Sequence, residues 1–280
     1  MRKSRSLLGI FLAVLLGCGL VWSPWPAAAA SERILSFNSL ITVHPDATLT
    51  VTENITVIST GNEIRRGIVR DFPTTYTNRH GRIVRVGFEI VEIRRDGRIE
   101  SYHTQTVANG VKIFIGQQNV FLSPGQYTYT ITYRTTRQVG FFQDFDELYW
   151  NVTGTGWTFS IDAASALVQL PPGAGVVQYA AYTGPYGARG QDFRVKQDAP
   201  GNIFFTTTRG LAPREGLTIA VAWPKGLVRE PSRGERTSDF IQDLIIAYPG
   251  PLAGGFLLLY HLAVWYRVGR DPGEGVIIPL

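Results

Sequence analysis

The sequence predicts an all-β fold: two consecutive β-sandwich domains with immunoglobulin-like patterning, followed by a single transmembrane helix. Three observations support this prediction. Hydrophobicity alternates along residues 32–225, Gly and Pro turns separate many short apolar runs, and one long uncharged stretch lies near the C-terminus. A period of two is typical of a strand with one buried face, and short strands separated by turns are typical of sandwiches.

The clearest expected strand is Thr48–Ile58, where apolar residues alternate with Thr and Asn. Such a pattern places the apolar side chains on one face of a sheet and the polar ones on the other. The preceding run, Ile34–Val43, is joined to it by four residues, which predicts a hairpin. Further along, the pair Asp96-Gly97 favours a tight primed turn between two more strands.

The number of expected strands suggests two domains. Some 13 strands in about 190 residues exceed one seven-stranded sandwich, so we expect sandwiches at 31–137 and 138–225, with a boundary in Arg137–Gly156. A single large sandwich is the alternative. Residues 226–243 are polar and contain Pro, Gly and Ser, which predicts a tether to the membrane.

Residues 1–30 have the pattern of a signal peptide: a basic start, an apolar run and a small-residue end. We expect cleavage after Ala30, with an uncleaved anchor helix as the alternative. The single cysteine, Cys18, would leave with this peptide, although its surroundings loosely resemble a lipidation site. A chain without cysteine can use neither disulfides nor a thiol nucleophile.

The second membrane signal is residues 244–266, which carry no formal charge. About 20 such residues cross the hydrocarbon core, so we expect this helix to contact the lipid bilayer. Arg267 and Arg270 follow it, whereas acidic residues precede it. Cytoplasmic flanks are enriched in basic residues. We therefore expect 31–243 outside a bacterial cytoplasmic membrane and 267–280 at the start of a cytoplasmic segment.

The charge of the chain does not indicate a nucleic-acid partner. The formal net charge is +5, of which three positive charges belong to the expected signal peptide. Residues 31–243 carry 22 basic and 20 acidic side chains, which nearly cancel. Nucleic-acid binding domains instead present a strong basic excess.

Familiar catalytic patterns are absent from the sequence. It contains no His-Glu-x-x-His helix, no Gly-x-Ser-x-Gly elbow and no phosphate-binding loop. The four histidines are scattered and lack neighbours at metal-ligand spacing. We therefore predict no catalytic residue, no metal and no cofactor.

The segment Gly140–Trp157 combines three carboxylates with six aromatic residues. Paired carboxylates with tryptophans could contact or cleave a sugar, and oxygen-rich side chains could hold calcium. The structural alternative, which we favour, is a covered corner in which aromatics fill the core and acids pair with arginines. The candidate ligand contacts are Asp144, Asp146, Glu147, Trp150 and Trp157.

Glu53 lies on the apolar face of its expected strand. A buried carboxylate is costly unless it is paired, so we expect a salt bridge to Arg66 or Arg70, with a functional acid as the alternative. The surrounding stretch, residues 65–98, holds nine arginines against four acids. This stretch could meet an anionic polymer, although exposed arginines are also ordinary on a sheet surface.

Four motifs resemble one family. They are the Leu49–Ile55 strand, the Arg66–Pro73 run that contains Asp71, the Asp146–Trp157 run that contains Asn151, and Gly269–Pro272. With them the chain resembles bacterial predicted membrane proteins that carry the domain of unknown function 2207, the YciQ-like group. The resemblance implies an exported β-rich domain, a membrane helix and a cytoplasmic part with further membrane helices. It implies no known activity and no catalytic residues.

Together these observations predict a non-enzymatic binding or assembly module of the bacterial cell envelope. Its partner would be an envelope protein or an anionic surface polymer. The alternative is a glycan-active enzyme, or a sugar or calcium site, built on Asp144–Trp157. Because the sequence stops at Leu280, early in the expected cytoplasmic part, we also expect it to be a piece of a longer protein.

Overall fold

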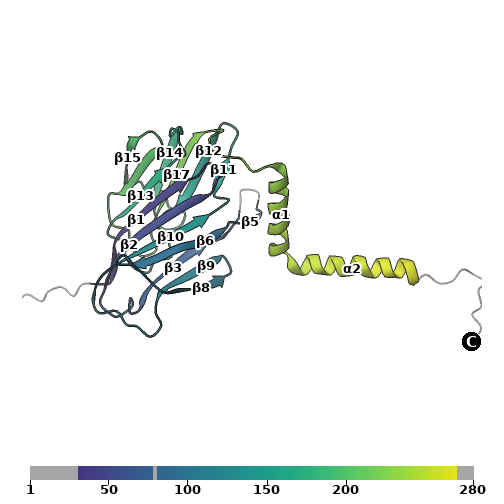
Figure 1. Ribbon diagram of the computed structural model, residues 1–280, viewed down its shortest axis with the longest axis horizontal. Helices are drawn as coiled ribbons and strands as arrows, with labels where there is room; N and C mark the ends of the chain where they lie inside the picture. The colour runs from purple at the N-terminus through teal and green to yellow at the C-terminus, as the bar shows by residue number, and fades with distance from the viewer. Residues whose placement is uncertain (1–30, 78–80, 270–280) are drawn as a thin grey trace, which may run out of the picture. The chain divides into compact units, whose positions relative to one another are not determined.

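The computed structural model describes residues 31–77 and 81–269 (Figure 1). Strands dominate the part predicted to be β, which confirms the all-β prediction, and two helices follow. The expected signal peptide with Cys18, residues Arg79 and His80, and the motif beyond Gly269 lie outside the described residues.

The described elements are, in chain order, β1 (Arg33–Val43), β2 (Leu49–Ser59), β3 (Gly67–Pro73), β4 (Thr75–Thr77), β5 (Ile83–Arg85), β6 (Phe88–Arg95), β7 (Arg98–Ile99), β8 (Tyr102–Val107), β9 (Gly110–Gly116), β10 (Gly125–Thr135), β11 (Val139–Phe141), β12 (Phe145–Asn151), β13 (Ala164–Gln169), β14 (Gln178–Gly184), β15 (Phe193–Ala199), β16 (Asn202–Thr207), β17 (Gly216–Pro224), α1 (Arg233–Ala247) and α2 (Pro249–Val268).

Eight strands form the largest sheet, in the order β15-β16-β13-β1-β2-β10-β6-β7. The predicted hairpin is present, because β1 pairs antiparallel with β2. The primed turn is also confirmed: Asp96 and Gly97 have φ values of 51° and 79° between β6 and β7. Positive φ at both central residues is the requirement of a type I′ turn.

The predicted two-residue period of β2 is confirmed by burial. Leu49, Val51, Glu53, Ile55 and Val57 are all fully buried, whereas the residues between them are partly exposed. On the other face, hydroxyl groups pair across the strands: the Oγ1 atoms of Thr52 and Thr132 lie 3.2 Å apart, and those of Thr56 and Thr128 lie 3.1 Å apart. This face is therefore polar, and the opposite face builds the core.

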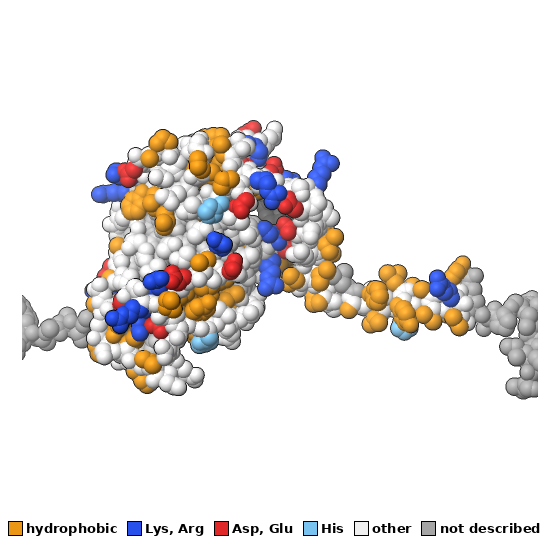
Figure 2. Space-filling model, viewed as in Figure 1, with side chains coloured by type: hydrophobic (Ala, Val, Ile, Leu, Met, Phe, Trp, Pro, Cys, Tyr) orange, Lys and Arg blue, Asp and Glu red, His pale blue; other side chains and the backbone are white. Residues whose placement is uncertain are grey.

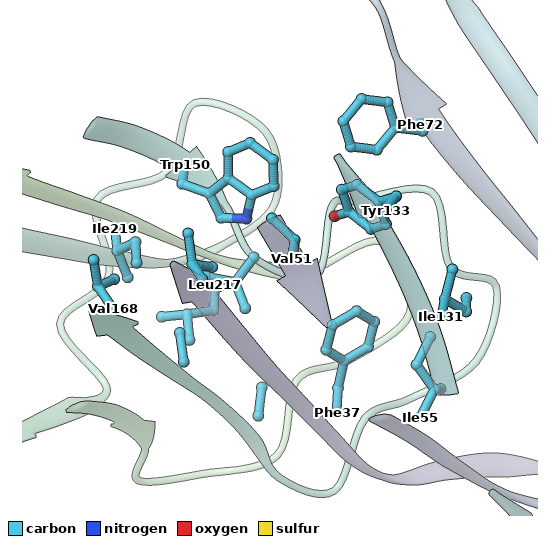
Figure 3. Packing of buried hydrophobic residues seen from close by; sticks show 14 of the residues in the cluster. Phe37, Val51, Ile55, Phe72, Ile131, Tyr133, Trp150, Val168, Leu217 and Ile219 are labelled. Carbon is cyan, nitrogen blue, oxygen red and sulfur yellow. The ribbon is translucent and has the colours of Figure 1, made fainter. Parts of the chain in front are cut away.

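Two smaller sheets contribute to the same core. One has the order β11-β12-β17-β14 and the other β3-β9-β8. Aromatic contacts connect them to the large sheet: the ring centroids of Phe72 on β3 and Tyr133 on β10 are 5.0 Å apart, and Trp150 on β12 lies 6.2 Å from Phe72 (Figure 3). One continuous set of buried side chains thus joins all three sheets.

The large sheet crosses the expected domain boundary in Arg137–Gly156. Strand β1 pairs in parallel with β13, and β13 continues the sheet to β16 and β15. Strands from 31–137 and from 138–225 are therefore hydrogen-bonded in one sheet, where we expected two successive sandwiches. The reason is that β1 has hydrogen-bonding groups on both edges, and β2 satisfies only one of them.

The expected tether, residues 226–243, is partly helical, because α1 begins at Arg233. The Ser232 side chain accepts a hydrogen bond from the Glu235 N–H, and the Glu235 carboxylate accepts one from the Ser232 N–H. This capping box satisfies amides at the start of the helix that would otherwise lack partners. The segment expected to be a tether is therefore helical after Ser232.

The expected helix 244–266 is interrupted at Tyr248, which separates α1 from α2. Pro249 opens α2, and a proline disfavours the helical conformation at the residue before it. Hydrophobic side chains cover much of the visible surface of α2 (Figure 2). Among the described helices, none is long and apolar enough to span a membrane alone; α1 and α2 together meet that criterion, with a 94° bend between them.

Candidate ligand-binding cleft

Parts of two sequence motifs line one open cleft of about 1730 Å³. Gly67–Pro73 on β3 contributes one wall together with β9. Tyr149–Asn151 on β12 contributes the other, together with β14, β17 and the loop at Gly154–Phe159. Motifs that are about 80 residues apart in the sequence therefore meet at one surface, as the Arg70–Thr153 contact shows.

A buried ion pair fixes the two walls to the large sheet. Arg70 donates from Nε to Glu53 Oε2 and from Nη2 to Glu53 Oε1, both at 2.8 Å. Tyr133 donates its hydroxyl to the same Oε1 at 2.8 Å. Arg70 is thus the partner that the sequence suggested for Glu53. Burial, and then the neighbouring Glu53 carboxylate, raise the pKa of Tyr133 well above its usual value, so it remains a donor.

Arg70 also contacts the Asp146–Trp157 motif. Its Nη1 donates to Thr153 O at 3.1 Å and its Nη2 to Val152 O at 3.4 Å. Trp157 Nε1 donates back to Thr153 O at 2.9 Å, which closes the loop. Gly154 has a φ of +70°, and a Cβ there would lie 3.3 Å from Arg70 Nη1. The Gly-x-Gly-Trp spacing is therefore explained by a turn packed against this arginine.

The two candidate tryptophans are part of the core. Trp150 and Trp157 are only 4% and 7% exposed. Trp150 lies among Phe72 and Tyr133 (Figure 3), and Trp157 packs edge-on against Phe37, with ring centroids 6.2 Å apart. Their ring faces are consequently not available as platforms for a sugar.

The three candidate carboxylates do not meet at a site. Asp144 is exposed, and Asp146 is 1% exposed with Lys225 Nζ 2.9 Å from its Oδ1. Adjacent strand residues point to opposite faces, so Glu147 lies on the other side of β12 from Asp146; burial raises the pKa of Glu147. None of the three lines the cleft. In 31–77 and 81–269, no three His, Cys, Asp or Glu residues are grouped to hold a metal ion.

The remaining motif residues have separate contacts. Arg66 does not reach Glu53, because its guanidinium lies over the Phe121 ring, 4.5 Å from the centroid. Asp71 is exposed in the cleft, with Lys112 Nζ 3.7 Å away on β9. Asn151 Oδ1 accepts a hydrogen bond from Thr218 at 2.6 Å.

In its described residues, 65–77 and 81–98, the arginine-rich stretch is not one continuous cationic surface. Arg70 is buried, Arg94 Nη2 lies 2.6 Å from Glu92, and Arg95 Nε lies 2.8 Å from Glu100. Two of these partners, Glu53 and Glu100, lie outside the stretch and offset part of its charge excess.

Sequence reasoning missed three tyrosines that the structure places in the cleft. Tyr149 and Tyr186 are 57% and 95% exposed, and Tyr182 is half-buried. Burial first, and then the neighbouring Tyr182, Tyr186 and Glu147, raise the pKa of Tyr149. Strand parity was the available signal, because Tyr149 alternates with the core residues Leu148 and Trp150.

Comparison with known proteins identifies relatives. Residues 33–223 match the model of the family described as "Predicted membrane protein (DUF2207) N-terminal domain". The chain is 29% identical over 244 residues to the uncharacterized protein YciQ of Escherichia coli strain K12; the match covers 86% of this chain and 38% of that protein.

Some solved structures show a distant likeness. Native leukotriene A4 hydrolase from Saccharomyces cerevisiae has a TM-score of 0.44 and 10% identity, covering 68% of this chain and 29% of the hydrolase. An M1 zinc metallopeptidase from Deinococcus radiodurans has a TM-score of 0.39 and 12% identity, covering 67% and 42%. These likenesses carry no argument about activity.

The family match spans most of the chain, and it coincides with the strands, the buried Glu53–Arg70 pair and the motif loop described above. The chain therefore belongs to the DUF2207 family of predicted membrane proteins and carries its N-terminal domain.

Proposed function

We propose that this chain is an exported, membrane-anchored β domain that serves as a non-enzymatic binding or assembly module of the bacterial cell envelope. The cleft is the observation that supports this most. Parts of two motifs line it, and the Glu53–Arg70 pair holds both in place beneath it. A concave surface with a few exposed polar and aromatic groups is suited to recognition.

The proposed topology places residues 31–243 outside the cytoplasmic membrane and the C-terminus in the cytoplasm. The family of predicted membrane proteins supports membrane association. The apolar helix α2 has a basic residue, Arg267, in its last turn and no acidic residue in its first. Basic residues at a helix end favour the cytoplasmic side.

The proposed partner is an envelope protein or an anionic surface polymer, bound in the cleft. The alternative, a glycan-active enzyme, would need two carboxylates about 5–10 Å apart across the substrate. Asp146 instead faces the core beside Lys225, and Asp144 and Glu147 do not line the cleft. The placement of these side chains therefore favours binding over sugar hydrolysis.

The binding proposal can be tested by site-specific crosslinking in intact cells. A photo-crosslinking amino acid is placed at Tyr149 in the cleft of the full chain, and at Val91 on β6 as a control of similar exposure outside it. We expect a distinct adduct from Tyr149 and none from Val91. Equal labelling at both positions, or none at either, would contradict a binding role for the cleft.

The orientation can be tested by cysteine labelling. Thr208 is exposed on the β domain, and the chain offers a single native cysteine to remove, Cys18. In a Cys18→Ser background, a Thr208→Cys variant should react with a membrane-impermeant maleimide in whole cells. Labelling that requires lysis would overturn the proposed outward orientation.

A further inference from the structure

The exposed tyrosines lie on one face of the four-stranded sheet. Tyr149 on β12 is opposite Ala220 of β17, and Tyr182 on β14 is opposite Thr218 of the same strand. Residues directly opposite each other in a sheet point to the same side. The small side chains of Ala220 and Thr218 therefore separate two rings on one surface, and the loop after β14 adds the exposed ring of Tyr186.

Two arginines lie at the adjacent end of this sheet. Gly184 pairs with Gly216 there; the loop that follows Gly184 carries Arg189, and the loop that precedes Gly216 carries Arg214. Both arginines line the cleft and are exposed. Within the described part of the chain, neither guanidinium has a hydrogen bond or an ion pair.

The other cations of the cleft are already matched by acids. Arg70 is paired with Glu53, and Lys112 Nζ lies 3.7 Å from Asp71. Arg189 and Arg214 therefore supply cleft-lining positive charge that an anionic ligand can neutralise, and the acid on the Tyr149 face of β12, Glu147, lies outside the cleft lining. An arginine fork matches a carboxylate in a bidentate arrangement.

A neutral donor completes this surface. The Oδ1 of Asn151 accepts the hydroxyl proton of Thr218, which leaves the Asn151 amide group to donate to a ligand oxygen. Asn151 shares its face of β12 with Tyr149, because the two are separated by one residue. The three tyrosine rings, the Asn151 amide and the two arginines therefore line the same cleft.

We infer that this end of the cleft binds an acidic polysaccharide, a chain of sugar rings that carry carboxylates. Tyr149, Tyr182 and Tyr186 would contact the C–H faces of the rings, and Arg189 and Arg214 the carboxylates. The volume of about 1730 Å³ exceeds the roughly 300–1000 Å³ of a small-molecule site, and it suits a polymer segment. The inference rests on the proposed binding function and specifies its ligand.

The test uses the full chain in lipid nanodiscs and two matched probes. The acidic probe is an oligogalacturonate, and the neutral probe is its fully methyl-esterified form, which keeps the rings and removes the charge. Isothermal titration should show binding of the acidic probe that weakens with salt, since exposed charges are screened. The neutral probe should bind at least about tenfold more weakly.

Variants assign the binding to the named residues. The double variant Arg189→Ala/Arg214→Ala should lose at least about tenfold in affinity, because two charge-assisted contacts disappear. Arg194→Ala is the matched control, since Arg194 is exposed on β15 and does not line the cleft. Tyr149→Ala should also weaken binding several-fold, with Tyr102→Ala, exposed on β8, as its control.

Three results would overturn the inference. They are equal affinity for both probes, unchanged affinity in the double arginine variant, and arginine-dependent binding to phosphatidylglycerol vesicles without binding of the oligogalacturonate. If crosslinking at Tyr149 still captures a partner in cells, the proposed binding function survives and only the ligand class fails. If crosslinking also fails, both are rejected.

Discussion

Two arginine–carboxylate pairs hold different parts of this molecule together. Arg70 and Glu53 join β3 to the large sheet, and their side chains are 7% and 0% exposed. Arg137 and Asp243 join α1 to the region of β5 and β10, and their side chains are 26% and 9% exposed. Both are arginine–carboxylate pairs, but the second is more exposed to solvent than the first.

The second junction has a different set of supporting contacts. Arg137 donates to both carboxylate oxygens of Asp243, at 3.0 and 2.6 Å, and the Arg85 N–H donates to the same carboxylate at 3.1 Å. A cavity of about 300 Å³ remains between α1 and the segment Gly81–Val84. The buried pair therefore joins the sheets in the core, whereas the outer pair attaches α1 through a more solvated contact.

The largest effect is expected from Arg70→Ala. Removing one partner leaves the Glu53 carboxylate buried and uncompensated, which costs about 3–5 kcal/mol of the free energy of unfolding. Denaturant unfolding of the variant measures this loss. Arg94→Ala, which breaks an exposed pair with Glu92, should leave the unfolding midpoint unchanged. A small loss for Arg70→Ala would show that the buried pair contributes little.

A double replacement separates the cost of a lone charge from the value of the pair. In Arg70→Met/Glu53→Leu both charges of this pair are removed. The variant should therefore recover most of the stability lost in Arg70→Ala. The hydrogen bonds to Thr153 O and Val152 O would still be lost. A double variant as unstable as the single one would mean that these loop contacts, rather than the ion pair, dominate.

The next effect is expected from Tyr133→Phe. This change removes one hydroxyl donor to Glu53 Oε1 and keeps the ring that packs on Phe72. A hydrogen bond to a charged group contributes about 1.5–3 kcal/mol, so we expect a loss near the middle of that range in denaturant unfolding. Tyr127→Phe is the control, because the Tyr127 hydroxyl donates to Ser123 O at an exposed position.

A smaller effect is expected from Asp243→Asn. The pair with Arg137 is partly solvated, so its contribution after screening is about 1 kcal/mol or less. Global unfolding should change little, whereas the amides of α1 should exchange hydrogen faster in mass-spectrometric measurements. Asp144→Asn, at an exposed carboxylate outside this contact, serves as the control. Unaltered exchange in α1 would show that other contacts hold the helix.

The smallest and most gradual effect is expected from pH. Burial would raise the pKa of Asp243, but hydrogen bonds from Arg137 and the Arg85 N–H outweigh it and lower the pKa. A lowered folded pKa stabilises the contact above the unfolded pKa, and this stabilisation is lost as the pH falls through the folded value. Spin labels at Thr237 and Val84 should move apart on acidification, and Asp243→Asn should abolish this pH response.

The strands and the buried pair could be predicted from the sequence because their causes are local. Alternation along β2 identified its buried face, and a lone carboxylate on that face required a nearby cation, which the structure supplies as Arg70. The Asp96-Gly97 turn was equally local, since few residue pairs tolerate positive φ at both positions.

The pairing of β1 with β13 could not be predicted in this way. Alternation shows which face of a strand is buried but not which strand lies beside it. The helix in 226–243 was not predicted for another reason: the polar composition of this segment hid the Ser232-x-x-Glu235 capping signal. Of the five predicted ligand contacts, Asp146, Trp150 and Trp157 face the core, whereas the exposed Tyr149 was not predicted.

The parallel pairing of β1 with β13 also has a consequence for how the protein is made. Asn38 and Ser165, which meet across these strands, are 127 residues apart in the chain. At a synthesis rate of about 5–20 residues per second, one edge of β1 waits roughly 6–25 seconds for its partner. During that interval the unpaired edge of β1 is open to wrong pairing. A chaperone that covers this edge would therefore act before β13, Ala164–Gln169, has been synthesised.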